Sequence, residues 1–161
     1  MEAVSVRGTL TQSELAEATR YMIWHRSPAL KLMCAIACLI GIAGLASLFL
    51  GLGIAGVPPV ILSALYLYFL YKMPVTTAQK QWKTFAHFAE EGTYEFDNEH
   101  FKIAFPSLQV SRPWSSVEST VELPDQFLIF VAKTTVHPVP KRFFTPEQLE
   151  SVRRKLRDQS R

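Results

Sequence analysis

The stretch that decides the fold is LMCAIACLIGIAGLASLFLGLGIAGVPPVILSALYLYFLY, which runs from Leu32 to Tyr71 without one Asp, Glu, Lys, Arg or His. A single membrane-spanning helix needs about 20 apolar residues, so this run is roughly twice as long as one span requires. Three glycines between residues 51 and 56 disfavour one continuous helix, and Pro58 and Pro59 suit the first turn of a second helix. The stretch therefore predicts a helical hairpin in a membrane.

We place the hairpin at residues 30–72, with its two spans at about 31–50 and 58–71. Charge predicts its orientation, because the connecting turn carries no charge and basic residues flank both ends of the hairpin. These residues are Arg20, Arg26, Lys31, Lys72, Lys80 and Lys83. Both termini are therefore expected to face the cytoplasm, in a multi-pass protein of the cell (inner) membrane. A cleaved signal peptide does not fit, because the apolar run begins roughly 30 residues into the chain and a second apolar segment follows it.

Residues 1–29 and 73–161 lie outside the hairpin and are together long enough for one small domain with its own core. Residues 4–9 alternate between apolar and polar side chains, which predicts a strand, and residues 11–14 (TQSE) form a capping box that starts a helix. Pro74 is expected to end or kink the second span. A further helix is then expected to stop at Gly92.

From Thr93 onward the hydrophobic period changes to two, which predicts a series of short strands. We expect strands near residues 94–96, 101–105, 108–112, 116–123, 126–131 and 135–139, in addition to residues 4–9. A final helix begins at Thr145, with Pro146 in its first turn and Gln148 completing a second capping box. The predicted class is thus α+β: a two-helix transmembrane hairpin plus a small cytoplasmic β-barrel or sheet domain capped by a C-terminal helix.

The chain shows no pattern that predicts catalysis. It has no phosphate-binding glycine loop, no nucleophile elbow and no H-E-x-x-H motif, and its four histidines have no ligands at metal-binding spacing. We interpret these histidines as surface or interface residues. Cys34 and Cys38 are one helical turn apart, and we interpret them as small apolar packing residues. We therefore predict no enzyme activity, no cofactor and no metal site.

The basic residues outside the membrane are the candidate contact surface. A Pro-Lys-Arg turn at residues 140–142 precedes a basic helix, and such clusters bind anionic lipid headgroups. The candidate contacts for anionic lipid or a protein partner are Lys141, Arg142, Arg153, Arg154 and Arg157. The alternative is that these residues are simply solvated. The net charge of +3 and the absence of an interleaved basic and aromatic patch argue against nucleic acid as a partner. Trp114 invites a ligand-stacking role, although we expect it to be a core residue.

Three segments carry a resemblance to a known family: LTQSE at residues 10–14, Trp114, and VPKRFF at residues 139–144. On these residues the chain resembles the YcxB-like family of small membrane proteins. The resemblance implies an N-terminal helix, a two-span hairpin and a C-terminal domain, here residues 73–161, that looks pleckstrin-homology-like. It implies no settled activity, so it assigns no catalytic residues.

Two functions fit these observations. The first is a membrane-anchored cytoplasmic module that binds a protein partner or anionic lipid, or acts as a scaffold. The second is an accessory subunit of a membrane protein complex, with the hairpin as the contact surface. Ala43, Ser47 and Gly51 form a ladder of small residues that lets another helix approach closely. The expected neighbour is the second span, and a homo-oligomer is the alternative.

Overall fold

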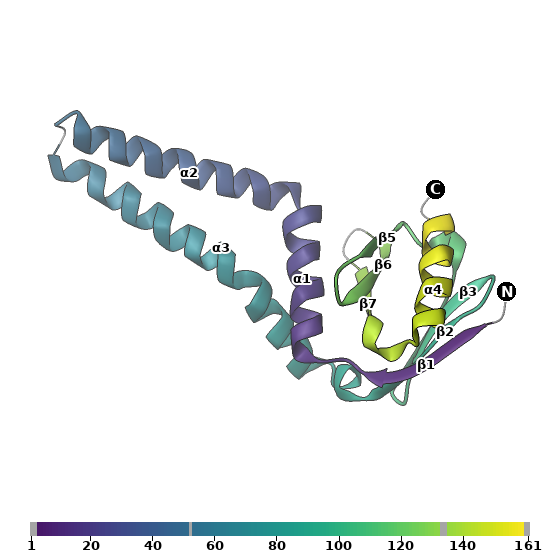
Figure 1. Cartoon of the computed structure of the whole chain (residues 1–161). Helices are drawn as coiled ribbons and strands as arrows, with labels where there is room; N and C mark the ends of the chain where they lie inside the picture. Colours follow the sequence, from purple (N-terminus) through teal and green to yellow (C-terminus); the bar gives the residue numbers. More distant parts are fainter. Residues whose placement is uncertain (1–2, 52, 133–134, 160–161) are drawn as a thin grey trace. The chain divides into compact units, whose positions relative to one another are not determined.

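The structure is a computed structural model that describes residues 3–51, 53–132 and 135–159. Figure 1 shows the elements that these residues form. The helices are α1 (Gln12–Arg26), α2 (Pro28–Phe49), α3 (Val57–Thr84) and α4 (Pro146–Gln159). The strands are β1 (Val4–Thr9), β2 (Glu91–Phe96), β3 (His100–Phe105), β4 (Leu108–Pro113), β5 (Ser119–Glu122), β6 (Gln126–Ala132) and β7 (Thr135–Pro140). The chain divides into two compact units, residues 19–77 and residues 1–18 with 78–161.

The second unit contains two antiparallel sheets, and all seven predicted strands are confirmed. One sheet has the order β1-β2-β3-β4, and the other has the order β5-β6-β7. The prediction of a barrel is wrong, because no ladder joins the two sheets among the described strands. The edge strand β7 contains Pro138 and Pro140, which have no N–H to donate to a neighbouring strand. A 3₁₀ turn at Trp114–Ser116 also delays the start of β5 and separates it from β4.

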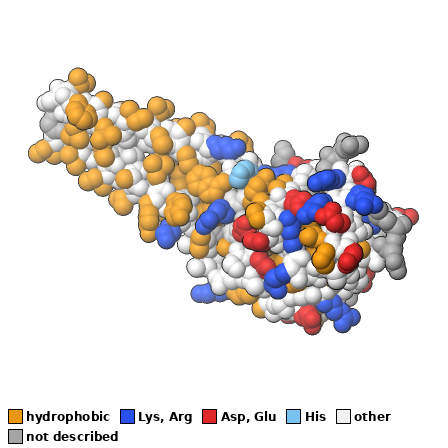
Figure 2. Space-filling model, in the orientation of Figure 1, with side chains coloured by type: hydrophobic (Ala, Val, Ile, Leu, Met, Phe, Trp, Pro, Cys, Tyr) orange, Lys and Arg blue, Asp and Glu red, His pale blue; other side chains and the backbone are white. Residues whose placement is uncertain are grey.

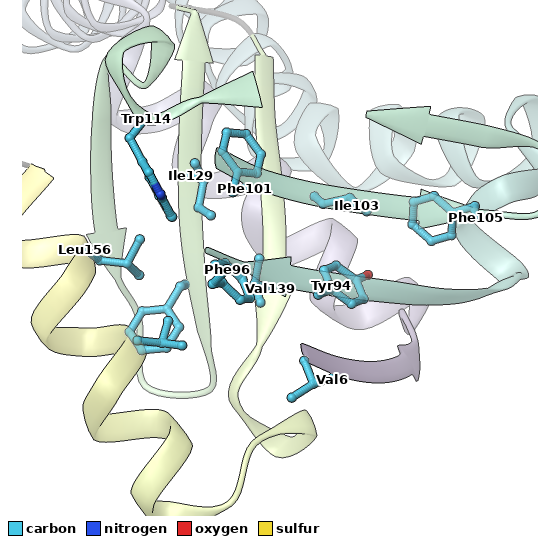
Figure 3. Close-up of a cluster of buried hydrophobic side chains, with 12 residues drawn as sticks. Val6, Tyr94, Phe96, Phe101, Ile103, Phe105, Trp114, Ile129, Val139 and Leu156 are labelled. Carbon is cyan, nitrogen blue, oxygen red and sulfur yellow. The ribbon is translucent and has the colours of Figure 1, made fainter. Parts of the chain in front are cut away.

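The core of this unit lies between the two sheets and α4. Side chains from both sheets and from α4 point toward one another, as Figure 3 shows for ten labelled residues. Trp114 is only 4% exposed, and its indole N–H donates to the Asp97 carbonyl oxygen at 2.9 Å. The prediction that Trp114 is a core residue is therefore confirmed.

The β1–β2 pair depends on two glycines that lie opposite each other. Gly8 and Gly92 are partners in the register of the ladder. A Cβ atom on Gly8 would lie 2.1 Å from the Phe143 ring, and one on Gly92 would lie 2.5 Å from the Phe105 ring. The absence of side chains at these positions makes room for the two rings. The prediction that Gly92 ends a helix is wrong, because this glycine belongs to strand β2.

Helix α3 does not end at Pro74. It continues from Val57 to Thr84 as one helix with the proline inside it. Proline removes one N–H donor from the helical ladder, here to the carbonyl of Leu70, but the helical turns on either side maintain their own hydrogen bonds. The second apolar helix is therefore longer than the predicted span, and the prediction of a separate helix between Pro74 and Gly92 is wrong.

The unit formed by residues 19–77 contains most of the hairpin. Ser27 caps α2 by accepting a hydrogen bond from the backbone N–H of Leu30 at 3.3 Å, and Pro28 occupies the first turn. The two helices approach closely at Gly44, where an added Cβ would lie 3.0 Å from the Gly56 carbonyl oxygen. Figure 2 shows hydrophobic side chains covering the visible face of α2 and α3. The helical segments Pro28–Phe49 and Ile54–Thr84 are long and apolar enough to cross a membrane.

Candidate functional site

The first feature of the site is an ion pair that joins the two ends of the domain sequence. The Arg142 guanidinium donates through Nε to Glu14 Oε1 at 2.8 Å and through Nη2 to Glu14 Oε2 at 3.1 Å. Nη2 also donates to the Thr9 carbonyl oxygen at 2.7 Å. Partial burial opposes ionisation of Glu14, yet the hydrogen bonds from Arg142 and Thr11 outweigh it and lower the pKa of the carboxyl group. Two of the three segments that carry the family resemblance therefore meet in space.

A second carboxylate, Glu122, holds two more of the predicted basic residues. Its Oε1 lies 2.8 Å from Lys141 Nζ and 2.7 Å from Arg153 Nη2. The hydrogen bond from Arg153, together with that from Lys141, outweighs partial burial and lowers the pKa of Glu122 to about 2. Arg153 also pairs with Glu150 within α4. Glu122 is thus ionised under physiological conditions and offsets the charge of its neighbours.

These contacts divide the five predicted contact residues into two groups. Lys141, Arg142 and Arg153 each contact a carboxylate, so their charges are largely balanced within the domain. Arg154 and Arg157 are exposed and form no ion pair within residues 3–51, 53–132 and 135–159. The structure does not bring the five residues together as one free basic surface. Their contact with anionic lipid stays a prediction.

A buried glutamine adds a further link between the N-terminal helix and the sheets. Gln126 is completely buried, and its Nε2 donates to the Glu14 carbonyl oxygen at 3.2 Å and to Glu17 Oε2 at 3.0 Å. Because a buried amide needs such partners, these bonds hold the first turns of α1 against β6. The sequence gives no sign of this contact, since the residues it joins are more than a hundred positions apart.

The second feature is an apolar groove of about 230 Å³, which we name the β4–β7 groove. It lies where β3, β4 and β7 meet the segment that links α3 to β2. Most of its lining side chains are aliphatic or aromatic. They are Leu10, Phe85, His87, Phe88, Tyr94, Ile103, Phe105, Leu108, Val110, Thr135, Val136, His137 and Pro138. Sequence reasoning missed this groove, because most of these residues follow the ordinary alternation of a strand.

Two histidines line the groove, and the charge of Arg112 acts on one of them, His137. His137 is half-buried and packs against Phe101, with ring centroids 5.9 Å apart. Burial, with smaller contributions from the charges of Arg112 and His87, lowers the pKa of His137 to about 4. The imidazole is therefore uncharged at neutral pH. Arg112 itself is exposed on β4.

The hairpin unit has a groove of its own, of about 520 Å³, between α2 and α3. Ser63 lies in this hairpin groove, and its hydroxyl donates to the Val60 carbonyl oxygen at 2.9 Å, which satisfies its polar atom. The lining residues are Met33, Ile36, Ala37, Ile40, Leu62, Ser63 and Tyr66. The groove thus presents an apolar surface. Cys34 and Cys38 are free cysteines on α2.

Comparison with known proteins gives a match to a family model. Residues 96–156 match the family model described as YcxB-like protein. No curated protein and no solved structure matches the chain. The matched residues extend from the end of β2 into α4, and they include β4, β7 and the Lys141–Arg142 turn. The similarity to the YcxB-like family is therefore shown over residues 96–156.

Proposed function

We propose that this protein is a membrane-anchored cytoplasmic module that binds a protein partner in the β4–β7 groove. The groove itself is the observation that carries the proposal. Leu108 and Phe85, which line it, are 39% and 47% exposed, although both are large apolar side chains. A concave apolar surface with a few polar groups is typical of a binding site. No catalytic role is part of the proposal.

The hairpin supports the membrane anchor. Helices α2 and α3 have the length and composition of spans, and many of their large apolar side chains are exposed. Basic residues before α2 and after residue 71 favour an orientation with both termini in the cytoplasm of the cell (inner) membrane. The order of a four-stranded sheet, a three-stranded sheet and a C-terminal helix supports a pleckstrin-homology-like domain. Anionic lipid near Arg154 and Arg157 is a secondary contact in this proposal.

The alternative function is an accessory subunit of a membrane protein complex that uses its hairpin as the contact surface. The hairpin groove favours it, because an apolar concave surface within a bilayer accepts the side chains of another helix. A second copy of the chain is one such occupant.

Photo-crosslinking in intact membranes tests the proposal against its alternative. A benzophenone amino acid at Leu108 probes the β4–β7 groove, and the same group at Ile36 probes the hairpin groove. A probe at Glu99, which is exposed and lines neither groove, is the matched control. The proposal predicts one defined protein adduct from position 108. An adduct from position 36 alone would favour the accessory subunit. The absence of any protein adduct from position 108 would contradict the binding module.

A further inference from the structure

We infer that the partner adds a strand to the free edge of β4, as an extended segment with alternating apolar residues and one acidic residue. This inference rests on the proposed function, since it names the chemistry of the partner for the same groove. It depends on three observations: the direction of the free backbone groups of β4, the prolines of β7, and the charge beside the groove.

The backbone direction of β4 follows from hydrogen bonds at the ends of β3. Alternate residues of an antiparallel strand bond to opposite neighbours. The N–H of Asp97 donates to the His100 carbonyl oxygen at 3.1 Å, so even-numbered residues of β3 face β2 and odd-numbered residues face β4. The N–H of Trp114 donates to the Glu99 carbonyl oxygen at 3.0 Å, in agreement with that alternation.

The same register decides which groups of β4 face outward. Residues 108, 110 and 112 pair with residues 105, 103 and 101 of β3, so their N–H and C=O groups point into the sheet. Gln109 and Ser111 direct theirs away from the sheet, and both residues are exposed. Within the described chain β4 has no strand on this side. An edge of this kind is a template for an added strand.

The edge of β7 has fewer of these donors than the edge of β4. The N–H of Lys141 donates to the Asp125 carbonyl oxygen at 2.9 Å, so odd-numbered residues of β7 pair with β6 and even-numbered residues face outward. The outward positions include Pro138 and Pro140, which have no N–H. A strand that enters the groove therefore pairs with β4 rather than with β7.

The side chains of the added strand alternate between the groove and the opposite face of the sheet. Those on the groove side meet Val110, Phe105 and Val136, which favours apolar residues at every second position. Arg112 follows Val110 on the same side of β4, and no carboxylate contacts it within the described residues. An acidic residue at that end of the partner is the complement of this charge.

The competing occupants fit less well. A lipid acyl chain has no N–H groups or carbonyls to pair with Gln109 and Ser111. A second copy that joined β4 to β4 would bring two Arg112 side chains into one ladder without a carboxylate. These occupants are outcomes of the experiment below.

The test measures binding of a fluorescent peptide to the full chain in lipid nanodiscs. The peptide has about six residues, with valine and threonine alternating and a glutamate near one end. Two further peptides carry N-methyl groups on every second backbone nitrogen, in the two alternative registers. Strand addition predicts that one methylated peptide loses at least about tenfold in affinity and that the other binds like the parent, because only one set of N–H groups faces β4.

Variants of β4 give an independent readout. Ser111→Pro removes an outward N–H without removing a bond to β3, and Ser111→Val is the matched control that retains this N–H. We expect Ser111→Pro to weaken binding at least about tenfold and Ser111→Val to leave it within about threefold. Arg112→Glu should weaken binding of the glutamate peptide and favour a peptide with lysine in its place. If Ser111→Pro does not fold, the affinities of the two methylated peptides alone test strand addition to β4.

Several results would overturn strand addition: failure of the parent peptide to bind, equal binding of both methylated peptides, displacement of the peptide by added phosphatidylglycerol, or a dimer that Ser111→Pro dissociates. The crosslink from position 108 decides the proposed function separately. If a defined adduct forms there but N-methylation of the peptide does not change its affinity, the proposed binding module is supported and strand addition to β4 is rejected.

Discussion

Trp114 illustrates at the scale of one residue how this domain combines packing with a hydrogen bond. Its ring contacts Phe96 and Phe101, and its N–H is satisfied by Asp97. We expect Trp114→Ala to lower the free energy of unfolding by roughly 3–5 kcal/mol, because it leaves a large cavity. Urea denaturation followed by circular dichroism measures this loss. Trp114→Phe is the control that retains most of the packing, and a loss below about 1 kcal/mol in Trp114→Ala would contradict a core role.

The lowered pKa of His137 makes the free energy of unfolding depend on pH. The unfolded imidazole titrates near 6.5, whereas its pKa in the folded domain is about 4, chiefly because of burial. Between these values the unfolded state binds the extra proton, so the free energy of unfolding falls as the pH is lowered from 6.5 toward 4. The loss is roughly 3 kcal/mol for a shift of this size.

Urea denaturation at a series of pH values measures this effect. His137→Gln has no titrating group at the position and should flatten the profile in that window. Glu14 and Glu122 have pKa values lowered from 4.5, so their contributions begin to be lost as the pH falls below about 4.5 and add to the slope only at the acidic end of this window. A wild-type profile that is flat between pH 4 and 6.5 would contradict a buried, neutral His137.

At the scale of elements, the β1–β2 pair depends on space as well as on hydrogen bonds. Gly8→Ala would place a methyl group against the Phe143 ring, which must then move. We expect a loss of about 1–3 kcal/mol in the free energy of unfolding, typical of overpacking. The same substitution in a Phe143→Ala background should cost less, because the clash is gone. Equal losses in both backgrounds would show that the ring does not limit the position.

The strands and helix starts are the elements that the sequence predicts well. Alternation located all seven strands, and the capping boxes at Thr11 and Thr145 form as expected. Local patterns are sufficient here because the alternation of a strand and the cap of a helix are both set by residues close together in the sequence. Pro74 and Gly92 misled the prediction, since the first is tolerated inside α3 and the second accommodates a ring from another strand.

The candidate site was harder to predict, because its geometry comes from distant pairs. The basic residues were visible in the sequence, but their carboxylate partners were not: Glu14 and Arg142 are 128 positions apart. The β4–β7 groove could not be predicted from the sequence for a related reason. Alternation shows which face of a strand is apolar, but it does not show whether the two edge strands meet or leave a groove between them.

The whole molecule combines two parts with different chemistry. One part has two long apolar helices with exposed hydrophobic side chains, and the other has two sheets, a core and an open strand edge. Both parts together suit the membrane-anchored binding module that we propose. The central claim is therefore that the hairpin crosses the membrane and leaves the β4–β7 groove in the cytoplasm.

Cysteine accessibility in intact cells tests that claim most directly. Cys34→Ala and Cys38→Ala remove the native thiols, after which single cysteines are placed at Ile54, in the turn between the spans, and at Gln109, on the edge of β4. We expect a membrane-impermeant maleimide to label position 54 from outside and to label position 109 only after the cells are permeabilised. Labelling of position 109 from outside, with position 54 protected, would contradict the central claim.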